Sequence, residues 1–153
     1  MATPKRADAT FELENNRPVY TLGVASQLAD IPSHSIRQYI DMGLIIPFKL
    51  ESKRHLFSQN DINRLKLIQG LIHDKGLNFA GVRTMMAMVP CWALRKCSER
   101  DKLSCNAYAE NFQPCWMASQ KGSLCKNMDC RECEVYHALD LDAGIKSVLY
   151  TLV

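Results

Sequence analysis

Residues 20–45 read YTLGVASQLADIPSHSIRQYIDMGLI, and this stretch decides the fold of the first half of the chain. Thr21 is of a type that caps helices, and the helix predicted after it is broken at residues 30–32. Ser33 is suited to cap a second helix, which Gly43 ends. The apolar positions of the first helix share one face: Leu22, Ala25, Leu28 and Ala29. Two short helices joined by a tight turn are typical of a helix-turn-helix, whose second helix enters the major groove of DNA.

The second predicted helix has an inner and an outer face. Ile36, Tyr39 and Ile40 point inward in this prediction. The polar side chains elsewhere on the helix are His34, Ser35, Arg37 and Gln38. Arg37 has the clearest role, because an arginine that donates two parallel hydrogen bonds to guanine discriminates between bases by about 1–3 kcal/mol. For Tyr39 the sequence leaves core packing and a phosphate contact through its hydroxyl both open.

The segment after this pair of helices, residues 44–58, reads LIIPFKLESKRHLFS. Short apolar pieces flank a charged tip, which predicts a small hairpin, or wing. Lys53, Arg54 and His55 lie at this tip and are expected to neutralise DNA phosphates, which adds affinity without sequence information.

Two further helices complete the first half of the chain. Ser58 and Asp61 form a capping box at the start of one helix, which runs to Lys75. Asn78 is suited to cap the next helix, and Pro90 ends it. Their inward positions at helical spacing are Ile62, Leu65, Ile68, Ile72, Val82, Met85, Met86 and Val89.

Residues 20–88 resemble the MerR family of bacterial transcription regulators through the helix pair above, the wing ending HLFS, and NDINRLKLIQGLIHDKGLNFAGVRTMM. The resemblance implies a winged helix-turn-helix domain that binds promoter DNA as a homodimer and acts on RNA polymerase indirectly by distorting that DNA. Arg37 matches the family's recognition-helix arginine, and Tyr39 an aromatic of its motif RYYE, here RQYI. Lys53 and His55 stand where the wing usually has Gly and Arg. The expected DNA-contacting residues are Thr21, His34, Ser35, Arg37, Gln38, Tyr39, Lys53, Arg54 and His55.

All seven cysteines lie in the second half of the chain: Cys91, Cys97, Cys105, Cys115, Cys125, Cys130 and Cys133. Thiolates are soft ligands for zinc and for iron–sulfur clusters. Cys130 and Cys133 form a CxxC pair that Cys125 can join, with a fourth ligand from the remaining cysteines. A zinc ribbon normally has two such pairs, and the ferredoxin run of closely spaced cysteines is missing. We therefore expect a [4Fe–4S] cluster first, with structural or sensed zinc and a metal-free thiol redox switch as alternatives.

Two of these cysteines precede tryptophan, at Cys91-Trp92 and Cys115-Trp116. About residues 90–136 resemble a small cysteine-rich module with two Cys-Trp pairs that is appended to bacterial chemoreceptors and regulators, which implies a sensory attachment and no particular chemistry. We thus expect a mainly α chain with four parts: a disordered arm (1–16), a MerR-type winged helix-turn-helix domain (17–89), a cysteine-rich sensory and dimerisation module (90–136), and a C-terminal helix or tail (137–153).

The composition is that of an ordinary globular protein, with 47% hydrophobic and 23% charged residues. No apolar run approaches the roughly 18 residues of a membrane helix, and residues 1–16 do not have the pattern of a secretory signal. We therefore expect a cytoplasmic protein with reduced thiols and no membrane partner. Residues 17–89 hold nine Lys or Arg against five Asp or Glu, in keeping with a nucleic-acid partner.

Two other functions stay open at this point. One is a thiol oxidoreductase that uses Cys130 and Cys133. A redox CxxC of the thioredoxin type lies in a βαβ setting, which residues 125–136 do not predict, so we expect no enzymatic activity. The other is a basic half that binds a partner protein in place of DNA, which a salt-dependent shift of duplex DNA would exclude.

Overall fold

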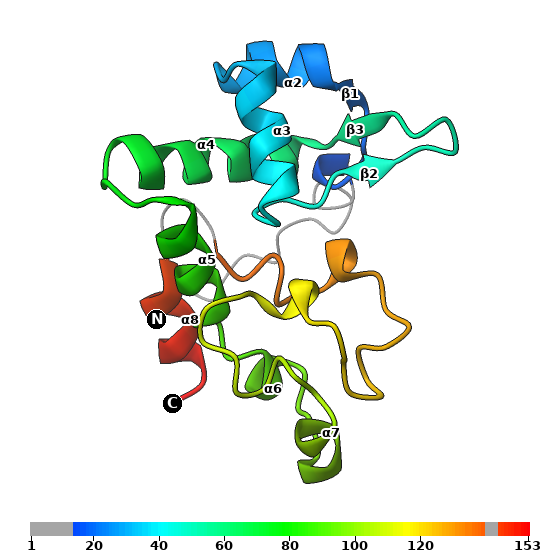
Figure 1. The fold of residues 1–153 in the computed structure, drawn as a ribbon, viewed down its shortest axis with the longest axis vertical. Helices are drawn as coiled ribbons and strands as arrows, with labels where there is room; N and C mark the ends of the chain where they lie inside the picture. The colour runs from blue at the N-terminus through cyan, green and yellow to red at the C-terminus, as the bar shows by residue number, and fades with distance from the viewer. Residues whose placement is uncertain (1–13, 140–143) are drawn as a thin grey trace, which may run out of the picture.

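The computed structural model describes residues 14–139 and 144–153, and it is mainly helical, as predicted. Its elements in chain order are β1 (Tyr20–Thr21), α2 (Leu22–Ala29), α3 (Ser33–Asp41), β2 (Phe48–Lys49), β3 (His55–Phe57), α4 (Gln59–His73), α5 (Phe79–Ala87), α6 (Cys91–Leu94), α7 (Glu99–Leu103), the short helices Cys115–Met117 and Cys130–Glu132, and α8 (Gly144–Thr151). Figure 1 shows α2, α3, α4 and the strands on one side of the molecule and α6 and α7 on the other.

Three of the predicted helix caps are confirmed. The hydroxyl of Thr21 accepts a hydrogen bond from the amide of Val24 at 3.3 Å at the start of α2. Ser58 and Asp61 form the capping box of α4, and the side chain of Asn78 caps α5. Each cap satisfies an amide that the first turn of a helix leaves unpaired, so the helix boundaries follow from local sequence.

The start of α3 differs from the prediction, although its end does not. Ser33 is the first residue of the helix and not its cap; Pro32 occupies the cap position without a side-chain hydrogen bond. Proline has a fixed φ that suits a helix start, which explains why no capping hydroxyl is needed. Gly43 follows the helix with a φ of +75°, the left-handed conformation typical of a helix end.

The predicted wing is confirmed, and a third strand joins it. β2 and β3 pair antiparallel, with Phe48 opposite Leu56. β1 pairs with the other edge of β3, with Tyr20 opposite Phe57. A strand of two residues has too little pattern to be predicted from sequence. Its pairing ties the start of α2 to the wing.

The buried core of this domain contains most of the predicted inward positions: Ala25, Ala29, Ile36, Tyr39, Ile62, Leu65, Ile68, Val82, Met86 and Val89. Four residues that were not predicted join them: Ile31, Leu44, Ile45 and Phe57. Leu28 was expected on the inner face of α2 but is exposed. The face of α2 that packs toward α4 consists of the small residues Ala25 and Ala29, which let the two helices lie close together.

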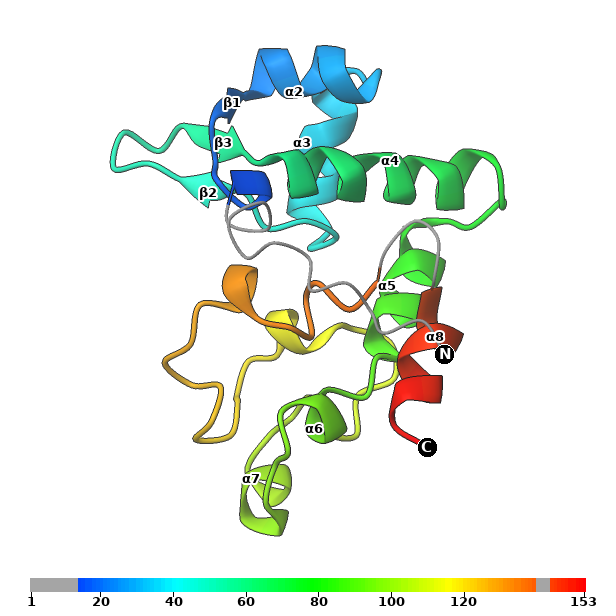
Figure 2. The same ribbon diagram turned by 180° about the vertical axis from the view of Figure 1, so that it is seen from behind.

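Residues 91–139 form a chain of turns and very short helices. Two of these short helices are α6 and α7. Leu103 on α7 is 90% exposed. Figure 2 shows the reason: α7 lies at the end of the molecule farthest from α2. Leu94 on α6 does pack against the core.

The remaining predictions about domain organisation concern the two ends of the chain. Residues 1–13 of the expected disordered arm lie outside the described residues, while residues 14–16 form a turn whose Asn16 accepts a hydrogen bond from Asn60 of α4. The expected C-terminal helix is present as α8, with Val148 buried. In the described part of the chain no helix is both long and apolar enough to cross a membrane.

Candidate nucleic-acid interface and cysteine pocket

The outer face of α3 carries the polar residues that the sequence singled out. His34, Arg37 and Gln38 are exposed, and Ser35 is half-buried. Burial of Ile36 on the opposite side fixes the rotation of the helix, so that Arg37 points to solvent. The exposed face of a second helix in a helix-turn-helix is the one that meets the major groove. Thr21 is also exposed, although its hydroxyl is engaged in capping α2.

Tyr39 does not fit the prediction of a DNA contact. Its side chain is only 3% exposed and its ring meets that of Phe79 edge to face, with centroids 6.0 Å apart. Burial also raises the pKa of its phenol. Tyr39 therefore belongs to the core between α3 and α5, which was the alternative that the sequence left open.

The tip of the wing presents Lys53 and Arg54 to solvent, with His55 half-buried at the start of β3. Lys53 has a φ of +64°, in the left-handed region that favours glycine. The turn closes through hydrogen bonds between Leu50 and both Lys53 and Arg54. The backbone of this turn therefore has a conformation that favours glycine, although a lysine with its positive charge occupies the position.

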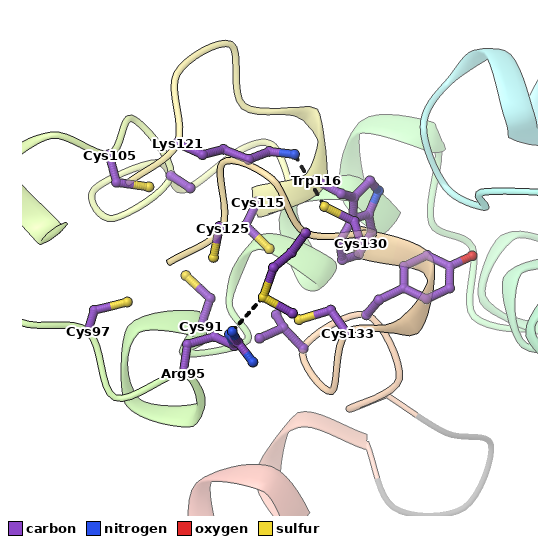
Figure 3. Close-up of a pocket in the computed structure, with 14 residues that line it drawn as sticks. Cys91, Arg95, Cys97, Cys105, Cys115, Trp116, Lys121, Cys125, Cys130 and Cys133 are labelled. Atoms are coloured by element: carbon purple, nitrogen blue, oxygen red, sulfur yellow. Dashed lines mark hydrogen bonds between the residues drawn. The ribbon is translucent and has the colours of Figure 1, made fainter. Parts of the chain in front are cut away.

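All seven cysteines line one pocket. It encloses about 550 Å³, part of it open to solvent, and Figure 3 shows the thiols arranged around it. They come from α6, from the turns after it and from both short helices of the module. The convergence of residues spread over more than forty positions was not evident from spacing, which pointed only to the group between Cys125 and Cys133.

Two of the thiols interact directly. A hydrogen bond with Cys115 lowers the pKa of the Cys91 thiol to about 7, and backbone amides add to this effect. The same hydrogen bond and burial raise the pKa of Cys115. A thiolate is the form of cysteine that binds metals and reacts with oxidants.

Two cationic side chains also line the pocket. The ammonium of Lys121 lies 3.2 Å from the sulfur of Cys130. Burial raises the pKa of the Cys125 thiol, and the guanidinium of Arg95 partly offsets this rise. Positive charge beside thiols stabilises their ionised form.

The thiols that line this pocket are donors that a soft metal prefers, but they are widely spaced. Among the described residues, no three His, Cys, Asp or Glu side chains lie close enough to hold a metal ion as they stand. Seven thiols around one pocket, with cations beside them, nevertheless provide the ligand type and the charge balance that zinc and iron–sulfur clusters require.

A direct connection runs from this pocket to the segment between α3 and the wing, residues 43–46. Trp116, beside Cys115, donates its indole N–H to the carbonyl of Gly43 at 2.7 Å. The amide of Ile46 donates to the hydroxyl of Tyr136 at 2.8 Å. The guanidinium of Arg64 bonds the carbonyls of Leu44 and of Tyr136, at 2.9 and 2.7 Å, and lies over the Tyr136 ring.

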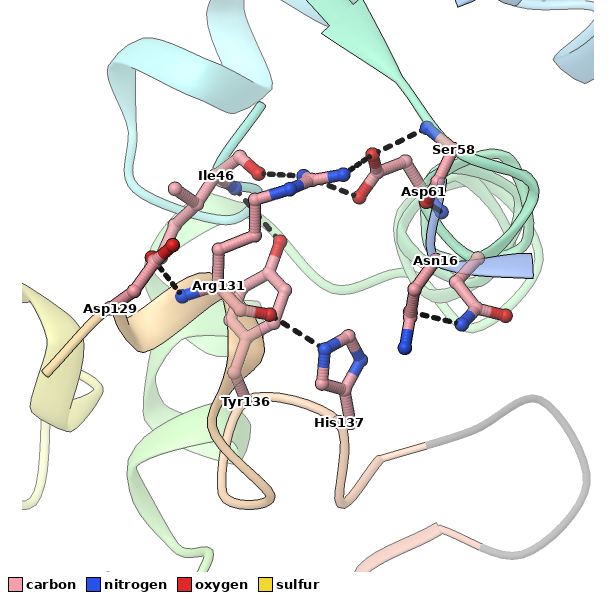
Figure 4. A network of polar contacts seen from close by, with 9 residues as sticks. Asn16, Ile46, Ser58, Asp61, Asp129, Arg131, Tyr136 and His137 are labelled. Atoms are coloured by element: carbon pink, nitrogen blue, oxygen red, sulfur yellow. Dashed lines mark hydrogen bonds and ion pairs between the residues drawn. The ribbon is translucent and has the colours of Figure 1, made fainter. Parts of the chain in front are cut away.

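The strongest polar contact of this connection is made by Arg131, which stands inside the CxxC pair. It forms two hydrogen bonds to the carboxylate of Asp61, at 3.0 and 2.6 Å, and donates a third to the carbonyl of Ile46 at 2.6 Å (Figure 4). Arg131 and Asp61 are both buried. Because Asp61 also accepts from the amide of Ser58, one carboxylate joins the start of α4 to the cysteine module.

A close approach at Gly43 completes the contact. A Cβ atom at this position would overlap the side chain of Met117, which follows Trp116 in the chain. The positive φ of Gly43 independently favours glycine. The sequence indicated Gly43 as a helix end but gave no sign that the cysteine module packs on it.

These features define the N-terminal part of the chain as a winged helix-turn-helix domain with an exposed polar face on α3 and two exposed cations at the tip of the wing. Residues 20–89 match the family described as MerR HTH family regulatory protein. This part of the chain is therefore a MerR-type helix-turn-helix domain.

Two kinds of relatives share this region. The chain is 33% identical over 78 residues to the putative heat shock protein HspR of Streptomyces coelicolor, which covers 51% of this chain and 52% of that protein. It is 32% identical over 77 residues to the HTH-type transcriptional regulator GlnR of Bacillus anthracis and of Bacillus cereus, which covers 50% of this chain and 59% of each relative. The chain thus spans little more than half the length of the relatives it matches.

Proposed function

We propose that the chain is a transcription regulator that binds promoter DNA through its MerR-type domain and responds to the state of its cysteine pocket. The DNA side of this proposal is supported by the exposed face of α3 and by relatives that include a transcriptional regulator. The observation that carries the regulatory side is the bonding of residues 43–46 by side chains of the cysteine module.

DNA binding would follow the usual division of labour between base and phosphate contacts. Arg37 would read a guanine edge, and Lys53 and Arg54 would neutralise phosphates. The regulator would act in the cytoplasm as a homodimer, so that two copies of α3 meet two half-sites and distortion of the promoter alters its use by RNA polymerase. No catalytic step is part of this proposal.

The pocket is proposed to hold a metal centre bound by thiolates. Both occupants considered from the sequence suit the donor set: a [4Fe–4S] cluster, which the sequence ranked first, and Zn²⁺. When bound, such a centre supplies a change of charge or ligation upon oxidation, loss or metal exchange. The thiols of Cys91, Cys115, Cys125, Cys130 and Cys133 would hold it, together with Cys97 and Cys105, and Lys121 and Arg95 would offset their charge.

The link from pocket to DNA would pass through Arg131. Because this residue lies between Cys130 and Cys133, any movement of those thiols changes the position of its guanidinium. The guanidinium bonds Ile46 and Asp61, which precede the wing and begin α4. A shift there alters the angle between α3 and the wing within one protomer, and across a dimer it alters the spacing of the two recognition helices. A coupling of about 1–3 kcal/mol is enough for a 5- to 150-fold change in affinity.

The test uses the full chain, purified without air. A duplex selected from a random-sequence pool would serve as the operator, and its affinity would be measured over a range of salt concentrations with the protein as isolated and after metal removal. We expect binding that weakens with salt and a difference between the two states of about 5- to 150-fold. No binding to any duplex at low salt would contradict the DNA role, and equal affinities in the two states would contradict the sensory role. A dithiol turnover assay on the same protein excludes or reveals the oxidoreductase alternative.

A further inference from the structure

The seven thiols do not surround the pocket evenly. A second, smaller space of about 290 Å³ adjoins the large pocket, and four of the seven cysteines line both: Cys91, Cys97, Cys105 and Cys125. The remaining three, Cys115, Cys130 and Cys133, line only the large pocket. In Figure 3, Cys97 and Cys105 lie toward one end of the pocket and Cys130 and Cys133 toward the other.

Cys91 lies between these two groups. It lines the smaller space with the first group and the large pocket with the second, where its thiol interacts with that of Cys115. Cys91 is also the first residue of α6, directly after the cap residue Pro90, so its backbone position is fixed by the end of the N-terminal domain. Two sets of four thiols that have Cys91 in common therefore account for all seven cysteines. Sharing one cysteine also explains why their number is odd.

We propose that the pocket binds two soft divalent metal ions of the zinc class, each held by four thiolates, with Cys91 bridging the two ions. One ion would be bound by the set lining the smaller space: Cys91, Cys97, Cys105 and Cys125. The other would be bound by the second set: Cys91, Cys115, Cys130 and Cys133. This inference rests on the proposed thiolate-held metal centre and specifies its stoichiometry and its ligands.

The coordination chemistry of such ions fits this division. Zinc in structural sites is bound by four ligands in a tetrahedron, with sulfur at about 2.3 Å from the metal. A thiolate sulfur has more than one lone pair, so a single cysteine can bind two ions. Metal binding would draw the sulfur atoms of each set together around its ion, since they stand farther apart in the structure as described.

The positive charges follow the same division. Arg95 interacts with Cys125 of the first set, and Lys121 lies 3.2 Å from the sulfur of Cys130 in the second. An ion with four thiolates carries net negative charge, which is costly in a partly buried pocket unless a cation lies beside it. Each proposed site therefore has its own counter-ion.

The experiment starts with metal and sulfide analysis of the full chain as isolated, followed by loading with an NMR-active cadmium isotope. We expect two ions per chain and no inorganic sulfide. We also expect two cadmium resonances, each coupled to the β protons of four cysteines, with those of Cys91 coupled to both. These couplings identify the bridging cysteine in the unmodified protein. The result therefore does not depend on whether a cysteine variant folds.

Two matched variants test the partition. Cys97→Ser is expected to lose one ion and to retain the resonance coupled to Cys130, whereas Cys130→Ser is expected to lose the other ion and to retain the resonance coupled to Cys97. One ion per chain, or two ions with no shared cysteine, would overturn the inference.

The failures of the two proposals can be told apart. Iron with sulfide in the isolated protein would overturn the two-ion inference but leave the proposed thiolate-held centre intact. A folded chain that binds neither metal nor cluster would overturn both.

Discussion

The MerR-type domain and the cysteine module are built by different physics. In the domain, regular helices begin at capping side chains and bury apolar stripes against one another. In the module, the longest helix before α8 has five residues, which is too short to be stable alone, and turns make up most of the rest. Its contact with the domain consists of side-chain hydrogen bonds and of apolar residues such as Val135 and Leu139, which join the domain's core.

This difference indicates where each part is sensitive to change. A helix with a buried face tolerates alteration of its exposed residues, because burial and not surface contact stabilises it. The module lacks that reserve, so we expect the loss of one buried polar contact to have a large effect. A part of low intrinsic stability attached beside the recognition helix is suited to act as a switch.

The largest expected effect is at the buried ion pair between the two regions. Arg131→Met leaves the carboxylate of Asp61 buried without its partner, which is expected to lower the free energy of unfolding by about 3–5 kcal/mol. Urea denaturation of the full chain measures this. Arg100→Met, a change of the same kind at an exposed position of α7, is the control and should stay within about 0.5 kcal/mol of the parent. If both variants were equally stable, the ion pair would not hold the module to the domain.

The two tryptophans offer a second comparison. Trp116→Phe keeps an aromatic ring but leaves the buried carbonyl of Gly43 without its donor, which is expected to cost about 1–3 kcal/mol. Trp92→Phe makes the same change at a ring that is 42% exposed and should cost much less. Thermal or urea unfolding of the two variants side by side gives the difference. A larger loss for Trp92→Phe would show that the contact at Gly43 is not what positions the module.

On the DNA side, Arg37→Ala is expected to weaken binding to the selected operator by about 5- to 150-fold and to relax the base preference at one position, because a guanine loses its two donors. Arg100→Ala removes an equal charge on α7, far from α3 in Figure 1, and should leave the base preference unchanged. Binding of both variants to operators mutated one base at a time provides the readout. An equal loss of affinity on every sequence for Arg37→Ala would place this residue on phosphate.

The smallest expected effect is at the tip of the wing, where two variants separate charge from backbone strain. Lys53→Gly and Lys53→Ala both remove one positive charge, so each should flatten the dependence of log affinity on log salt by about one unit. Only the glycine variant relieves the left-handed φ at this position, so it should be more stable than the alanine variant by about 0.5–1 kcal/mol. Identical stabilities would mean that the turn adapts to the alanine side chain.

Prediction from sequence succeeded where the determining contacts are local. The caps at Thr21, Ser58 and Asn78 satisfy amides within three residues, and the wing follows from a short apolar–charged–apolar pattern. It failed where burial depends on a partner element. Tyr39 was grouped with DNA contacts because of its place in a motif, yet the packing of α5 over α3 buries it. The two-residue strand β1 exists only because β3 lies beside it.

The cysteine region shows the same limit more strongly. Clustering of Cys125, Cys130 and Cys133 indicated a thiol site and left the other four cysteines as candidates for a fourth ligand, but that all seven line one pocket needed the tertiary structure. The side chains that connect this site to α3 and the wing were not singled out as a connection by the sequence, because their partners lie 20 to 90 positions away: Arg64, Arg131, Tyr136 and Trp116.

The sequence by itself determined the helices, most of their caps, the wing and the polar outer face of α3, since each depends on neighbours within a few residues or on a periodic pattern. Only the tertiary structure decided which thiols share a pocket and that Arg131 joins this pocket to the segment between α3 and the wing. The physical reason is that a buried hydrogen bond or ion pair between distant residues leaves no periodic trace in the sequence; it exists only where the folded chain removes both groups from water.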